Sequence, residues 1–261
     1  MTLPPLSHLA AATAAAFVAG AINAIAGGGT NVSFPALVWL GLPPVVANAT
    51  SAVALWPGSL AGAWGYRRPL RGARPAWFWL IAPSVVGGAI GAWLLVALPS
   101  RAFAAVAPWL VLASTALFAG RLLLARRAVA SAPEQTPPRL ARRSLLAGLL
   151  VQLLIAIYGG YFGAGIGILM LATLGICGID DRDLANGLKN LLAAAINGTA
   201  VIGFALAGKV EWRIALVMAL GAIAGGWAGA HIAQRLPPLV ARWSIVAIGV
   251  LMTIATFRSL R

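Results

Sequence analysis

Two short glycine clusters are the parts of this sequence whose composition could bind a ligand. Each cluster lies directly before an apolar run, so its residues fall at the expected start of a helix. The free N–H groups of a helix start favour negative charge, and glycine lets an anion approach the backbone closely. We therefore predict two backbone cradles for an anion; close packing of helices through small residues is the alternative. The candidate binding residues are Gly27, Gly28, Gly29, Thr30 and Asn31 in the first cluster and Gly163, Gly165 and Gly167 in the second.

Polar side chains mark one face of the second apolar run after each cluster, at 45–66 and 184–207. In the second half they lie at the first, fourth, fifth and twelfth positions counted from Asn186, and at about 100° per residue these positions share one helix face. A polar face within lipid must meet protein or water, so it indicates a pathway lining. Hydrogen bonds between helices are the alternative. The candidates are Asn186, Lys189, Asn190 and Asn197, with Asn48 and Ser51 at matching positions of the first half.

The charged residues narrow the chemistry further. Lys189 suits a counter-charge for an anion, whereas extension of its side chain to the membrane surface is the alternative. All five acidic residues lie in loops or at the ends of apolar runs. The sequence also lacks a phosphate-binding glycine loop, a His/Cys metal spacing and a nucleophile–base arrangement. We therefore expect no enzyme activity, no metal, no cofactor and no ATP-driven pumping by this chain.

The elements that must position these residues are membrane helices. Of the 261 residues, 61% are hydrophobic and 9% are charged, whereas a soluble domain has about 45–50% apolar and about 25% charged residues. This composition excludes a soluble enzyme, a secreted domain and a disordered chain. We expect an all-α, polytopic membrane protein with about eight to ten membrane segments. The net charge of +14 comes from arginines in short loops, which orient a membrane protein and do not indicate a nucleic-acid partner.

The chain also reads as two halves of similar sequence. The pair Ala47-Asn48 recurs as Ala185-Asn186, and Leu98-Pro99 recurs as Leu236-Pro237, both at an offset of 138 residues (186 − 48). Several ordered matches at one offset favour a duplication. We therefore divide the chain into a first membrane repeat at 1–124, a basic cytoplasmic linker at 125–143 and a second membrane repeat at 144–261.

The second segment of each repeat is expected to be a broken or re-entrant half-helix. The run 30–41 has 12 residues, or about 18 Å as a helix, whereas the hydrocarbon core is about 30 Å thick. Each run follows a glycine cluster, and broken helices of this kind surround the substrate sites of many transporters. An odd number of crossings in each repeat would make the repeats inverted, and an even number parallel. The weakly charged loop 209–213 favours inverted repeats.

At these motifs the sequence resembles the sulfite exporter TauE/SafE family, also called TSUP. The resemblance rests on GAINAIAGGGTNVSFPAL at 20–37, ANATSAVAL at 47–55, GGAIGAWL at 87–94, GGYFGAGIGILMLATL at 159–174, ANGLKNLLAAAING at 185–198 and GGWAGAHIAQRLPP at 225–238. It implies a duplicated helical fold without a cofactor and the export of sulfite, organosulfonates or related sulfur anions across a bacterial-type inner membrane. The second cluster lacks the Thr-Asn pair of the first, so a symmetric site is not expected.

The residues and the resemblance together predict a multi-pass transporter of the inner, or plasma, membrane. Its partners would be a small inorganic or organic sulfur anion and the lipid bilayer, with a site between the two repeats and either passive or ion-coupled transport. A homodimer is left open, because apolar faces that meet lipid and those that meet protein look alike in a sequence. The alternative is a membrane subunit or scaffold for another membrane protein that transports nothing itself.

Overall fold

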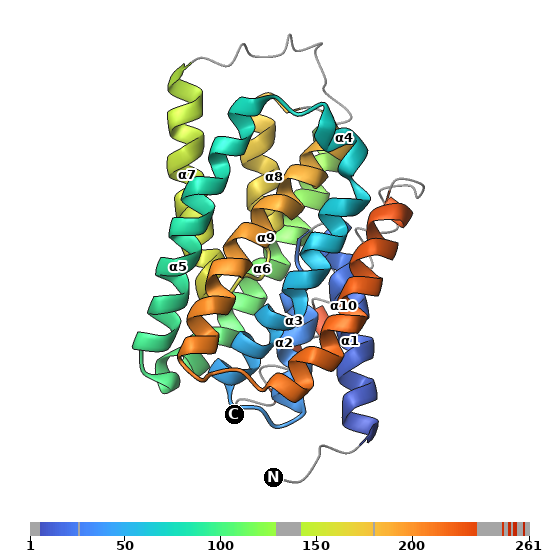
Figure 1. Cartoon of the computed structure of the whole chain (residues 1–261), viewed down its shortest axis with the longest axis vertical. Coiled ribbons are helices and arrows are strands. Elements are labelled where there is room, and N and C mark those ends of the chain that lie inside the picture. The colour runs from blue at the N-terminus through green and yellow to red at the C-terminus, as the bar shows by residue number, and fades with distance from the viewer. Residues whose placement is uncertain are drawn as a thin grey trace.

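The fold is described from a computed structural model that covers residues 6–25, 27–128, 142–179 and 181–233, with single positions at 247, 250, 251, 253, 254 and 258. Every regular element within these residues is a helix (Figure 1). In chain order they are α1 (Leu6–Ile25), α2 (Thr30–Trp39), α3 (Pro44–Gly65), α4 (Arg67–Arg71), the 3-10 helix η1 (Pro75–Leu80), α5 (Ile81–Ala97), α6 (Ser100–Ala128), α7 (Arg142–Tyr161), α8 (Ile166–Ile176), α9 (Arg182–Leu206) and α10 (Trp212–Ala233).

Five stretches are long and apolar enough to cross a membrane. They are Leu6–Ile25, Pro75–Ala97, Ser100–Leu117, Arg182–Leu206 and Trp212–Ile232, with lengths of 18 to 25 residues. At about 1.5 Å per residue these helices are roughly 27–38 Å long, which matches a hydrocarbon core of about 30 Å. Large apolar side chains such as Trp93 and Leu154 lie exposed on the outside of the molecule, where lipid would cover them. The prediction of an all-helical, polytopic membrane protein is confirmed.

The helices are arranged around a central pair. α3 packs against α9, α10 packs between α3 and α1, and α5 packs between α9 and α7 (Figure 1). Glycines permit the closest of these contacts: a Cβ at Gly225 of α10 would overlap the carbonyl of Phe17 in α1, and one at Gly91 of α5 would overlap that of Ile157 in α7. Small residues bring helix backbones together in membrane proteins in this way.

Both glycine clusters interrupt the helices. α1 ends at Ile25 and α2 begins at Thr30, while α7 ends at Tyr161 and α8 begins at Ile166. Gly27, Gly163 and Gly165 have positive φ values of 79°, 83° and 76°, a conformation that only glycine adopts without strain. α2 and α8 have 10 and 11 residues, about 15–17 Å of helix. The interruptions match the expectation from the sequence, whereas the role of these helices as membrane half-helices stays a prediction.

Parts of the predicted domain boundaries lie outside the described residues. Residues 129–141 of the expected linker 125–143 are among them, as are Leu236 and Pro237 and most of the chain after 233. α6 continues to Ala128 and α7 begins at Arg142. The division into two repeats and a linker therefore stays a prediction.

Candidate binding site between the two helix breaks

The two helix breaks meet inside the molecule although they are far apart in the sequence. The backbone N–H of Gly167 donates a hydrogen bond to the carbonyl of Gly27 at 3.1 Å. A Cβ on Gly27 would overlap the Cα of Gly167. At these two positions glycine therefore serves the close approach of one backbone to another. Gly29 has a similar role, because a Cβ there would overlap the carbonyl of Ala19.

A small cavity lies between the two breaks. The space open to the centre of a water molecule is about 10 Å³, which is room for about one water. Four polar side chains contribute to its wall, and the remaining lining residues are glycine or apolar. The lining residues are Asn23, Thr30, Asn48, Ala52, Leu55, Gly159, Gly160, Phe162, Gly163, Ile166, Asn197 and Phe204. Thr30, Asn48, Gly163 and Asn197 are the members of this wall that the sequence had indicated.

The cavity faces the N-terminal ends of two helices. Thr30 is the first residue of α2 and Ile166 is the first residue of α8, and both line the cavity. The N-terminus of a helix carries about half a positive charge, and here the N–H groups of Asn31, Gly167 and Ile168 donate to carbonyls of the two breaks. No carboxylate is among the described residues that line the cavity. These two N-terminal ends therefore favour a negative ligand, whereas the carbonyl end of α7, at Gly159 and Gly160, also lines the cavity.

Asn48 is the most buried polar side chain of the cavity wall, with 2% of its surface exposed. Its Nδ2 donates to the carbonyl of Tyr161, the last residue of α7, at 3.0 Å. Its Oδ1 is buried and has no hydrogen-bond partner in the described part of the chain. Asn23, on the other side of the cavity, donates from Nδ2 to Ser59 Oγ at 2.9 Å. Sequence reasoning missed Asn23, whose signal is an amide side chain within an apolar run.

Lys189 lies next to the cavity wall but does not line the cavity. It is fully buried, and its Nζ donates to the carbonyls of Asn23 at 2.9 Å and Ala24 at 2.8 Å. Asn190 donates from Nδ2 to the same Ala24 carbonyl at 3.2 Å. These carbonyls belong to the C-terminal end of α1, where a helix carries partial negative charge. The ammonium group therefore neutralises the broken end of α1 from inside the protein.

The remaining predicted residues do not line the cavity. Asn31 Oδ1 accepts a hydrogen bond from Ser114 Oγ at 2.6 Å, and Ser51 Oγ lies 2.6 Å from Ser33 Oγ. Asn186 is buried, with an Oδ1 that has no partner in the described residues. The others outside the cavity wall are Gly27, Gly28, Gly29, Gly165, Gly167, Lys189 and Asn190. The predicted binding residues therefore divide into those that line the cavity and those that do not.

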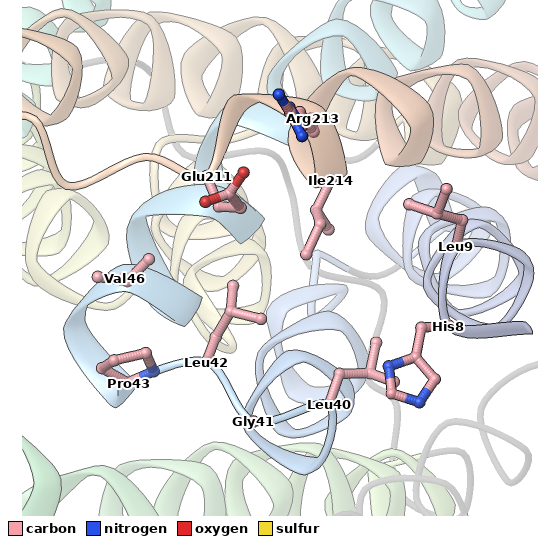
Figure 2. Close-up of a pocket in the computed structure, with 10 residues that line it drawn as sticks. All are labelled: His8, Leu9, Leu40, Gly41, Leu42, Pro43, Val46, Glu211, Arg213 and Ile214. Atoms are coloured by element: carbon pink, nitrogen blue, oxygen red, sulfur yellow. The ribbon is translucent and has the colours of Figure 1, made fainter. Parts of the chain in front are cut away.

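A larger pocket opens at the end of the molecule where α1 begins, and Figure 2 shows its wall. Its volume is about 300 Å³, and it is formed by the start of α1, the turn between α2 and α3 and the loop before α10. Glu211 and Arg213 lie along one edge, and His8 lies across the pocket from them (Figure 2). Sequence reasoning missed this pocket, because its walls come from three segments that are far apart in the sequence.

The described residues contain no group of three or more His, Cys, Asp or Glu side chains that could hold a metal ion.

The chain matches the family model "Sulfite exporter TauE/SafE" over residues 12–256. It is also 31% identical, over 245 residues, to a "Probable membrane transporter protein" of Haemophilus influenzae, an alignment that covers 91% of this chain and 89% of that protein. No solved structure matches the chain.

Proposed function

The chain belongs to the sulfite exporter TauE/SafE family, and on that premise we propose that it carries small anions through the cavity between its two helix breaks. The family is one of membrane transporters and not of enzymes. The family description points to sulfite, and sulfonates or related sulfur anions share its charged, oxygen-bearing group. The name of the Haemophilus influenzae relative specifies transport but no substrate.

The observation that carries the proposal is the position of the cavity between two helix N-termini. Thr30 and Ile166, the first residues of α2 and α8, both contribute to its wall. Two such ends supply partial positive charge in a site from which bulk water is excluded, where electrostatic attraction is strong. The side chain of Asn197 adds an amide group that can donate hydrogen bonds to an oxyanion.

The size of the cavity implies that it changes during transport. Its volume of about 10 Å³ holds about one water molecule, and a sulfur oxyanion is larger. The described conformation is therefore a closed one, and binding requires the walls to separate. Gly163 lies in the cavity wall at the second helix break and has a positive φ of 83°. Because glycine has no side chain, its backbone angles can change there at little cost.

Contacts between the halves support two repeats related by a twofold axis. Trp56 Nε1 donates to the carbonyl of Ala194 at 3.0 Å, and Thr115 Oγ1 lies 3.4 Å from Thr253 Oγ1; both pairs are 138 residues apart. This is the offset of the repeated sequence motifs, and residues that contact their own counterparts lie on a twofold axis. α1 and α7 also begin at opposite ends of the molecule (Figure 1), as inverted repeats require.

The arginines suggest how the protein sits in an inner membrane. Arg67, Arg68 and Arg71 are on α4, which lies at the opposite end of the molecule from the start of α1 (Figure 1). Loops rich in Lys and Arg face the cytoplasm. The α4 end is then cytoplasmic, and the pocket of Figure 2 opens outside. With the cell interior negative, export of a monovalent anion gains about 2.3 kcal/mol per 100 mV.

The test is sulfite flux through purified protein in liposomes. Labelled sulfite or an alkyl sulfonate is loaded inside, a potential of either sign is imposed, and efflux is compared with that from protein-free liposomes. We expect protein-dependent efflux that is faster with the interior negative. An efflux rate that does not depend on the membrane potential would contradict potential-driven export. The absence of flux for every sulfur anion would contradict the proposed function.

A further inference from the structure

The two helices that end at the breaks have different partners at their carbonyl ends. At the end of α1, the carbonyls of Asn23 and Ala24 accept hydrogen bonds from the Lys189 ammonium at 2.9 and 2.8 Å. At the end of α7, the carbonyl of Tyr161 accepts one from the neutral Nδ2 of Asn48 at 3.0 Å. Both ends carry the partial negative charge of a helix C-terminus, but the partner at α1 is a cation and the partner at α7 is an amide.

The offset of the two halves makes this difference informative. Tyr161 is the counterpart of Asn23 at 138 residues, and Ser51 is the counterpart of Lys189. Ser51 is fully buried, and its Oγ lies 2.6 Å from Ser33 Oγ. The second half therefore supplies a fixed ammonium to the end of α1, whereas the first half supplies an uncharged residue at the matching position.

Asn48 places an unpaired oxygen next to the carbonyl end of α7. Its Nδ2 must face the carbonyl of Tyr161, because two oxygens would repel there, so the orientation of the amide is fixed. The Oδ1 then points elsewhere, buried and without a partner in the described residues. Asn48 lines the small cavity together with Phe162, which is the counterpart of Ala24. A buried acceptor, a helix C-terminus and room for one small species thus coincide.

We propose that this cavity binds one small monovalent cation, Na⁺, at the carbonyl end of α7. Asn48 Oδ1 and the backbone at Phe162 would supply oxygen ligands, and Lys189 is the tethered equivalent of this cation at the end of α1. Carbonyl ends of broken helices hold Na⁺ in transporters, so no carboxylate is needed. The site gains a coupling role if the proposed anion transport holds, because a cation beside the anion favours the binding of both.

Thermal unfolding of the purified full-length protein in detergent tests the site without any sulfur anion. Sodium chloride is titrated against choline chloride at constant total chloride. We expect a saturable rise in the unfolding temperature with Na⁺, and its loss in Asn48→Ala. The matched control is Ser84→Ala on α5, which removes the acceptor of a 2.8 Å hydrogen bond from Gln152 outside the cavity. This variant should keep the Na⁺ response. No saturable response, or a response that survives Asn48→Ala, would overturn the proposal.

A second variant decides the matter if Asn48→Ala does not fold. Asn48→Asp replaces the Nδ2 donor with a carboxylate oxygen, which repels the Tyr161 carbonyl unless a cation lies between them, so we expect half-saturation at a roughly tenfold lower Na⁺ concentration. An unchanged Na⁺ dependence would overturn the site. The two proposals fail separately: a Na⁺ response without sulfite flux refutes anion transport and supports the cation site, whereas sulfite flux without any Na⁺ response refutes the cation site.

Discussion

Alanine at Gly163 would place a methyl group beside the proposed anion site. A Cβ there would lie 3.1 Å from the carbonyl of Gly159 and 3.6 Å from Thr30 Oγ1. These contacts are tight but not prohibitive, so the main folding penalty is the positive φ of 83°, which costs about 1–2 kcal/mol for a residue with a side chain. The methyl group would lie beside Thr30 in the wall of a cavity that has room for about one water molecule. At sulfite concentrations below saturation we expect the flux to fall by about tenfold or more, which corresponds to about 1.4 kcal/mol of lost binding.

Gly208 offers a matched control for backbone strain. It has a positive φ of 64°, follows α9 in a loop, and has no heavy atom within 4 Å of the position its Cβ would take. Gly208→Ala should therefore lose a similar amount of stability and keep its flux. Thermal unfolding and sulfite efflux would be measured on both variants side by side. Equal loss of flux in the two variants, or full flux in Gly163→Ala, would refute the placement of the site.

Three further outcomes follow from the packing. Lys189→Met removes charged hydrogen bonds worth about 1.5–3 kcal/mol each, so the unfolding temperature should drop sharply; an unchanged value would contradict the role of the ammonium. Gly27→Ala would overlap Gly167 and should prevent recovery of folded protein, as judged by size-exclusion chromatography. Burial, reinforced by Asp183 and opposed by Arg182, raises the pKa of Tyr66 from 10.0 to about 12. The free energy of unfolding of the wild type should therefore decline between these pH values, and Tyr66→Phe should lack this decline. At neutral pH Tyr66→Phe should be at least as stable as the wild type, because the buried hydroxyl has no partner in the described residues.

Local signals in the sequence predicted the helix breaks. Glycine clusters before runs too short to cross lipid indicated interruptions, and the helices end and restart at both clusters. The positive φ values at Gly27 and Gly163 explain why glycine is needed there. The sequence could not separate glycines that pack backbones together, such as Gly27 and Gly167, from those that line a cavity, such as Gly163. Both uses require the absence of a side chain.

Contacts between distant segments were beyond prediction from the sequence. Helical periodicity placed Lys189 and Asn190 on one face of α9, and both are buried. Their partners are backbone carbonyls of α1 about 165 residues earlier in the chain, and a carbonyl leaves no residue-specific signal. Asn23 was not predicted for a related reason, because its place in the cavity wall depends on how α1 packs against α3 and α9.

A structure determined with a bound anion tests the central claim most directly. Selenite is a close chemical analogue of sulfite, and its selenium can be located by anomalous scattering in crystals of the protein. The account predicts an anomalous peak between the first turns of α2 and α8, beside Thr30 and Asn48. A peak elsewhere, such as in the pocket of Figure 2, with none between the two helix breaks, would contradict it.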